Sequence, residues 1–355
     1  MTDFQSLLPE LPSQCARQRW SELRGSGLGL SVALAMQQCS APILVVCRDG
    51  NRAQQLEADI RFYSDQPDAV VHFPDWETLP YDSFSPHQDI ISERLRILHR
   101  LTRQERLVLV TTVTSLLQRI APSSYLAAHS TLLKSGQRFD INTERAQWEA
   151  AGYRCVDTVY EHGEFAVRGS VVDLFPMGSQ VPFRLELFDD ELESLRSFDP
   201  ETQRTLEKVA AIEILPAREF PLDKAGIQRF RSQWHDTFDV DHRKCPTYRD
   251  VSDGIAPAGI EYYLPLFFEQ TESLLDYLPT DSLLFADAAL EPVVQQYWQD
   301  ITNRYDELGI DPTRPLLAPK HLFMANEELF GRFKGLSRVV FSLDRADKSQ
   351  FVFPA

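Results

Sequence analysis

The sequence has few cysteines, and their arrangement suggests neither a disulfide framework nor a zinc site. The five cysteines of the 355-residue chain are an odd number, scattered without a CxxC pair. The eight histidines are equally dispersed, and none has a partner at metal-ligand spacing. This usage is typical of a reducing compartment, so we expect a cytoplasmic protein without a bound metal.

Long hydrophobic runs and an excess of positive charge are also missing. No apolar stretch approaches the roughly 18 residues of a membrane span, and no signal segment is visible. There are 36 Lys and Arg against 52 Asp and Glu, a formal net charge of −16. Because phosphate neutralisation needs clustered cations, this balance argues against a large DNA-binding face. The apolar end at 351–355 is typical of a truncation point, so we expect a fragment of a longer protein.

The first part of the chain alternates between buried strands and amphipathic helices. Continuous apolar runs, such as 43–47, indicate strands that are buried on both faces. Strands alternating with helices predict a mostly parallel α/β sheet. Residues 1–20 show only a weak pattern. The expected strands are 43–47, 70–73 and 107–113, and the expected helices are 30–38, 51–62 and 91–101.

The pattern changes near residue 125, after which period-2 segments separated by turn residues predict an antiparallel meander. The expected strands there are 165–175, 181–188 and 192–198, after a helix at 144–150. Helical and apolar segments return from residue 216, with a buried strand at 283–286. We therefore predict three domains: an α/β domain over 1–125, an inserted β-rich domain over 126–213, and a segment over 214–355 that completes or packs on the first.

Several stretches resemble the excision-repair protein UvrB. RGSVVDLFP at 168–176, RLELFDDE at 184–191 and FDP at 198–200 are similar to UvrB domain 2, which binds UvrA. GIEY at 259–262 resembles a segment of UvrB domain 1B. WETLPYDSFSP at 76–86 is similar to a segment of bacterial transcription-repair coupling factors, found where UvrB carries its damage-probing hairpin. The resemblance implies a degenerate RecA-like, helicase-like α/β fold (UvrB domains 1A and 1B) with an inserted antiparallel β-rich α+β domain.

The first half of a nucleotide site is degenerate. A P-loop has the form GxxxxGK[ST], in which backbone N–H groups cradle phosphates and the Lys neutralises them. Here Arg24 stands in place of the first Gly, and Gly29, Leu30 and Ser31 follow with Leu30 in place of the Lys. A GxGxxG motif is also absent, and no clear strand precedes these glycines. We interpret the glycines at 25, 27 and 29 as a flexible turn left from an ancestral loop.

The second half of the nucleotide site is incomplete as well. The strand at 283–286 is followed by Asp287, but Ala288 stands where the catalytic Glu is needed. Six residues, 87–92, occupy the place of the UvrB hairpin and are too few to form it. We therefore expect no ATP hydrolysis, no nucleotide cofactor and no lesion verification by this chain. The motif EHGE at 161–164 has no third ligand nearby and is interpreted as a loop.

One face of the β-rich segment has the composition of a binding surface. Alternation along 184–188 predicts that Leu185 and Leu187 face the core, whereas Arg184, Glu186 and Phe188 share the other face. Aromatic and Arg residues are enriched at binding hot spots. Arg168 can join this face if its strand pairs suitably. Alternatively, the arginines form exposed pairs with Glu164 or Glu186, and Phe188 packs under a loop.

The resemblance favours the binding alternative, because the matching arginines of UvrB belong to its UvrA-binding surface. It implies a non-catalytic adaptor that recruits UvrA through Arg168, Arg184 and Phe188. It also implies further domains in the parent protein that bind RNA polymerase and translocate on DNA with ATP and Mg²⁺. Two alternatives remain: an ATP-dependent, damage-binding subunit like UvrB, or a module that regulates the parent protein's own motor.

Overall fold

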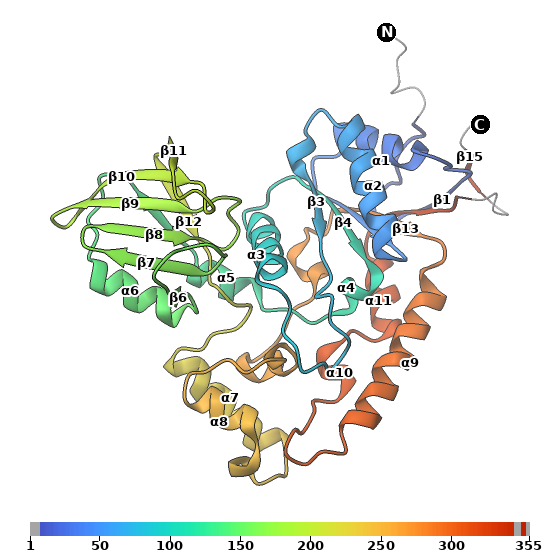
Figure 1. Cartoon of the computed structure of the whole chain (residues 1–355). Coiled ribbons are helices and arrows are strands. Elements are labelled where there is room, and N and C mark those ends of the chain that lie inside the picture. The colour runs from blue at the N-terminus through green and yellow to red at the C-terminus, as the bar shows by residue number, and fades with distance from the viewer. Residues whose placement is uncertain (1–7, 344–348, 353–355) are drawn as a thin grey trace.

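The computed structural model describes residues 8–343 and 349–352, which form a mixed α/β structure with two large sheets (Figure 1). One sheet has seven parallel strands in the order β15-β1-β14-β13-β2-β4-β3, and the other has six strands in the order β11-β10-β9-β8-β7-β6. The predicted combination of a parallel sheet with a β-rich antiparallel one is confirmed. The assignment to RecA-like and UvrB-like domains and the three domain boundaries remain predictions.

The parallel sheet combines strands from both ends of the chain. Its central strands are buried along their whole length and mostly apolar, as the uninterrupted hydrophobic runs predicted. The strands β13 and β14 from the last third of the chain lie between β1 and β2. The bounds are β1 Arg17–Ser21, β2 Ile43–Cys47, β3 Val70–Phe73, β4 Val108–Thr112, β13 Leu283–Asp287, β14 Ser337–Phe341 and β15 Phe351–Val352.

Helices cover both faces of this sheet. On one face, Ile43, Val45 and Cys47 pack with α1 (Gly27–Gln38) and α2 (Gly50–Tyr63). The alternate residues of the same strand face the other helices and a core that continues into the β-rich part of the chain. The helices on that second face are α3 (Gln88–Thr102), α4 (Val113–Leu117), α9 (Leu290–Leu308) and α11 (Asn326–Phe333).

The six-stranded sheet lies to the left of the parallel sheet in Figure 1. Its neighbouring strands are antiparallel except β6 and β7, which are parallel. The helix α6 (Ile141–Ala150) packs Trp148 edge-on against Phe165 of the inner face. The strands are β6 Arg154–Cys155, β7 Glu164–Arg168, β8 Val171–Phe175, β9 Phe183–Phe188, β10 Glu191–Phe198 and β11 Thr205–Lys208.

A two-stranded antiparallel ladder joins the two parts of the chain. It pairs β5 (Thr131–Lys134), which leads into the β-rich part, with β12 (Ala211–Ile214), which leads out of it. The remaining helices are α5 Ser123–His129, α7 Lys224–Thr237, α8 Pro246–Ser252 and α10 Pro319–Leu322. Short 3-10 helices lie at Pro67–Ala69, His242–Lys244, Ile260–Phe267 and Leu274–Tyr277.

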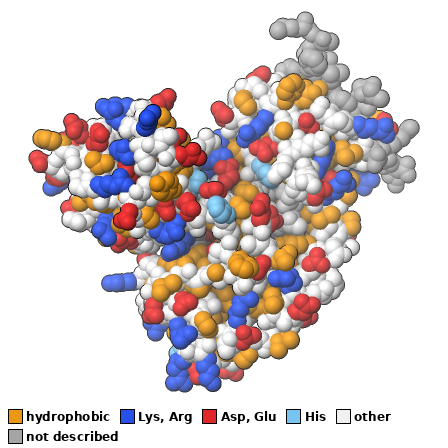
Figure 2. All heavy atoms as spheres, viewed as in Figure 1, with side chains coloured by type: hydrophobic (Ala, Val, Ile, Leu, Met, Phe, Trp, Pro, Cys, Tyr) orange, Lys and Arg blue, Asp and Glu red, His pale blue; other side chains and the backbone are white. Residues whose placement is uncertain are grey.

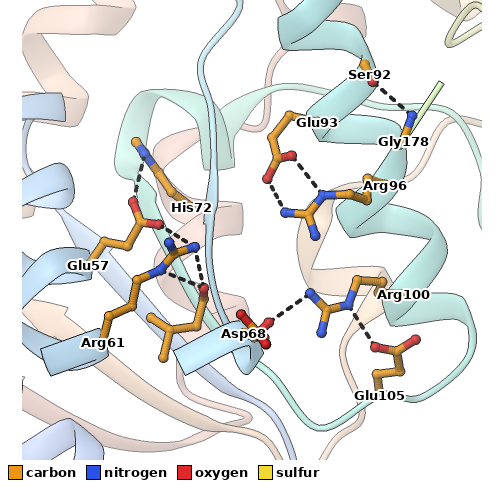
Figure 3. Close-up of polar contacts among 11 residues, drawn as sticks. Glu57, Arg61, Asp68, His72, Ser92, Glu93, Arg96, Arg100, Glu105 and Gly178 are labelled. Carbon is orange, nitrogen blue, oxygen red and sulfur yellow. Dashed lines mark hydrogen bonds and ion pairs between the residues drawn. The ribbon is translucent and has the colours of Figure 1, made fainter. Parts of the chain in front are cut away.

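Polar contacts hold the β-rich part against α3. The Gly178 amide donates to Ser92 Oγ over 2.8 Å (Figure 3). His162 Nδ1 lies 2.7 Å from a carboxylate oxygen of Asp89, and its Nε2 lies 2.7 Å from the Ser179 carbonyl oxygen. His162 therefore sits in a loop contact, and no group of three or more potential metal ligands occurs among the described residues.

Two sequence expectations about strands were wrong. The residues before α1 do form a strand, β1, with the sequence RQRWS. Exposed and partly buried side chains alternate only over its first three residues. The segment 165–175 is not one strand but two, because the chain reverses between β7 and β8 at Gly169, whose φ is +65°. A glycine adopts this left-handed conformation readily. In the described part of the chain, no helix has the length and apolarity needed to cross a membrane.

Candidate functional site

The outer face of the six-stranded sheet brings the predicted binding residues onto one surface. Strand register places Asp173 of β8 opposite Arg184 of β9, and Arg168 of β7 opposite Val171 of β8. Directly paired residues point to the same side of a sheet, and Val171 and Asp173 are alternate residues of one strand. Arg168 and Arg184 therefore lie on the same face. Leu185 points the other way and is fully buried. The alternation predicted for β9 is therefore present in the structure.

A buried carboxylate lies between the two arginines. Asp173 is 1% exposed, and its Oδ1 and Oδ2 accept hydrogen bonds from Nε and Nη2 of Arg184 over 2.7 and 2.9 Å. Nη1 of Arg168 lies 3.6 Å from Oδ2 of the same carboxylate. The sequence alternative paired the arginines with Glu164 or Glu186, and this pairing was wrong. Both arginines share the cross-strand partner Asp173 instead.

The two arginines differ in how much of each side chain is available. Only 19% of the Arg184 side chain is exposed, and its guanidinium lies 5.0 Å from the centre of the Phe198 ring. The hydrogen bonds to Asp173 raise the pKa of Arg184. The Arg168 side chain is 48% exposed, and its Nη2 donates to the Asp157 carbonyl and to Thr158 Oγ1. Arg168 therefore presents more of its guanidinium to solvent than Arg184 does.

Two further residues extend this outer face. Phe188 ends β9 and is 68% exposed, so it does not pack under a loop. Arg196 of β10 is exposed and lies directly opposite Arg184 in the sheet. Figure 2 shows hydrophobic, basic and acidic side chains interspersed on the visible face of the left-hand lobe, where the six-stranded sheet lies. Arg196 was missed from the sequence because cross-strand register places it beside Arg184, whereas Asp173 was expected to have a structural role.

The segment predicted as a degenerate phosphate loop takes part in the packing of α1 on α2. Gly27 and Gly29 lie inside α1, and only Gly25, with a φ of +55°, lies in a turn, so the interpretation of all three as a flexible turn was wrong. A Cβ built on Gly29 would lie 2.5 Å from Cβ of Asp59, which shows that this glycine serves close helix packing. Arg24 is exposed in the preceding loop.

The other predicted positions of the nucleotide site have local partners. Ser31 is buried, and its Oγ donates to the Gly27 carbonyl over 2.8 Å. Leu30 is half-buried in the first turns of α1. Asp287 ends β13 and accepts the Ala289 amide over 2.9 Å, and Ala288 is exposed beside it. His87, the first of the six residues 87–92 that were expected to replace a hairpin, caps α3, which begins at Gln88.

A cavity of about 300 Å³ lies where the start of α3 meets the segments 217–220 and 256–261. Glu261 lines it, is 7% exposed, and accepts a hydrogen bond from Ser85 Oγ over 2.8 Å. Burial raises the pKa of Glu261 to about 7. Nearby, the buried Arg94 and Glu219 form an ion pair of 2.9 Å. Nothing in the linear sequence distinguished Glu261 from an exposed glutamate.

Comparison with known proteins finds a family model that matches the segment carrying this surface, and relatives that match most of the chain. Residues 132–220 match the family model of the UvrB interaction domain. The chain is 47% identical over 331 residues, 93% of its length, to the transcription-repair-coupling factor of Escherichia coli (strain K12). It is 42% identical over 96% of its length to that of Haemophilus influenzae, and 30% identical over 90% to that of Myxococcus xanthus. It spans 28–30% of the length of these relatives. The chain is thus homologous, over most of its own length, to a part of the transcription-repair-coupling factors that contains a UvrB interaction domain.

Proposed function

We propose that this chain is a non-catalytic adaptor module of a cytoplasmic transcription-repair coupling factor, and that it docks UvrA in nucleotide excision repair. The observation that carries the proposal is the outer face of β7–β9. There, Arg168, Arg184 and Phe188 lie within the segment that matches the UvrB interaction domain. An exposed aromatic beside arginines is the composition of a binding hot spot. RNA polymerase and DNA would be engaged by other domains of the parent protein.

The alternative of a UvrB-like ATP-dependent subunit is less well supported. Leu30 offers neither charge nor hydrogen-bond donor to a phosphate, and Ala288 has no carboxylate to orient a water molecule. The start of α1 is packed tightly on α2 through Gly29. These features favour a module that binds no ATP or Mg²⁺ of its own. The further alternative, a module that regulates the parent protein's motor, predicts no affinity for UvrA in isolation.

The test is binding of the purified chain to UvrA. Arg168→Ala and Phe188→Ala are each expected to weaken binding about thirtyfold or more, because hot-spot truncations typically cost at least ~2 kcal/mol. Arg184→Ala is also expected to weaken binding, because it leaves the buried Asp173 without its bidentate partner. Arg145→Ala is the matched control, since Arg145 is exposed on α6, the helix that packs on the opposite face of the sheet through Trp148 and Phe165. Circular dichroism checks folding. A wild-type chain that binds no UvrA would refute the adaptor proposal and favour the self-regulatory alternative.

A further inference from the structure

We propose that Asp173 is the positioning residue of the docking surface, and that it gives the two arginines unequal roles. In this inference, which rests on the proposed function, Arg168 makes the direct ionic contact with a carboxylate of UvrA. Arg184 acts indirectly, by holding the Asp173 carboxylate in place. The three groups lie side by side on adjacent strands, so their geometry is set by the sheet.

The hydrogen bonds divide the carboxylate unequally between the arginines. Two nitrogens of Arg184 donate to the two oxygens of Asp173. This bidentate arrangement fixes the guanidinium plane relative to the carboxylate plane. Its stem is covered, and Phe198 lies beneath its guanidinium. A partner could reach only the remaining exposed fraction of this side chain. The Arg184 guanidinium is thus already hydrogen-bonded to Asp173 in the absence of UvrA.

The Arg168 guanidinium is hydrogen-bonded within the chain and is still partly exposed to solvent. Its Nη2 is bound by Asp157 and Thr158, and its Nη1 lies at the outer limit of an ion pair with Asp173. These contacts orient the guanidinium while leaving about half of the side chain accessible. A group held in this way loses little conformational freedom when it binds, which favours affinity. The chemistry that fits the exposed edge is a carboxylate.

Asp173 also balances the charge of the face. Arg196 lies directly opposite Arg184, and like charges at such positions repel one another. The buried carboxylate offsets this repulsion, and the group of Arg168, Asp173 and Arg184 has a net charge of only +1. Removing the charge of Asp173 would release Arg184 and deprive Arg168 of one of its three anchors. The effect on UvrA binding should therefore depend on Arg168.

A double-mutant cycle on UvrA affinity tests this dependence. In the wild-type background, Arg168→Ala is expected to weaken binding about thirtyfold. Asp173→Asn, which keeps the shape but removes the charge, is expected to weaken it about tenfold, within the range measured for coupled contacts. In the Asp173→Asn background, Arg168→Ala should cost less than about threefold more, because its oriented contact is already lost. Equal costs of Arg168→Ala in the two backgrounds would overturn the inference.

Two lysine variants give a second test that leaves Asp173 intact. Arg184→Lys should lower the midpoint of thermal unfolding, because lysine cannot make the bidentate contact, while UvrA affinity stays within about threefold. Arg168→Lys should leave the midpoint unchanged and weaken UvrA binding about tenfold, since the planar fork is lost. If Arg184→Lys weakens binding as much as Arg168→Lys, the unequal roles are refuted. A wild-type chain that does not bind UvrA refutes the proposed function itself, which is a distinct result.

Discussion

Glu261 should make the stability of this protein fall as pH rises towards 8. Its carboxyl group is 7% exposed, and burial raises its pKa from 4.5 to about 7. The folded state therefore binds a proton more tightly than the unfolded state does. The penalty of ionising the buried group is absent below pH 4.5, develops between the two pKa values, and is fully present above the folded value. The difference between these pKa values corresponds to about 3 kcal/mol.

Replacing Glu261 by Gln removes the ionisation and keeps an oxygen that can accept the Ser85 hydroxyl. The variant should be more stable than wild type by about 3 kcal/mol at pH 8 and by less than ~1 kcal/mol at pH 5. Urea unfolding at several pH values measures this difference. Glu307→Gln, which removes an exposed carboxylate of α9, controls for net charge. A Glu261→Gln variant that is less stable than wild type at pH 8 would refute the reasoning, since it would mean that the ionised carboxylate is stabilised in the fold.

Two predictions concern the segment that was predicted as a degenerate nucleotide site. Gly29→Ala should lower the free energy of unfolding by about 1–3 kcal/mol, because its Cβ would meet Asp59, whereas Gly50→Ala in open space should be nearly neutral in the same urea experiment. Leu30→Lys should not confer ATP binding, since the Ser31 hydroxyl is engaged by the Gly27 carbonyl and Arg24 stands in place of the first Gly of the motif. Saturable binding of a fluorescent ATP analogue with Mg²⁺ by Leu30→Lys would contradict the second prediction.

Strands that are buried on both faces were the part of the fold most accessible from sequence. The run at 43–47 is apolar at every position, and it becomes the buried strand β2. In contrast, β1 carries the exposed residues Arg17 and Arg19, so its five residues give no hydrophobic pattern, and it is recognised from its pairing with β14 and β15. The reversal at Gly169 was missed because the residues on both sides of it are equally strand-forming.

The candidate site shows the same limit. Alternation along one strand correctly separated Leu185 from Arg184 and Phe188, because it depends only on local geometry. The partner of the arginines could not be predicted, since it requires the register of β7, β8 and β9, which long-range packing determines. Asp173 therefore looked like one polar residue in an apolar stretch. Its role became visible only when the three strands were placed together.

The two parts of this chain differ in how far their predicted site residues are engaged within the fold. At the segment predicted as a degenerate phosphate loop, Gly29 and Ser31 serve packing and hydrogen bonding within and between helices, so building a phosphate cradle there would require breaking contacts that stabilise the fold. On the face of the six-stranded sheet that carries Arg168 and Arg184, the larger core lies on the opposite side and only a small buried cluster, which includes Phe198, lies on the same side. Phe188 is 68% exposed and alternates with Arg184 along β9, so its side chain is available for the contact with a partner that the proposed docking requires.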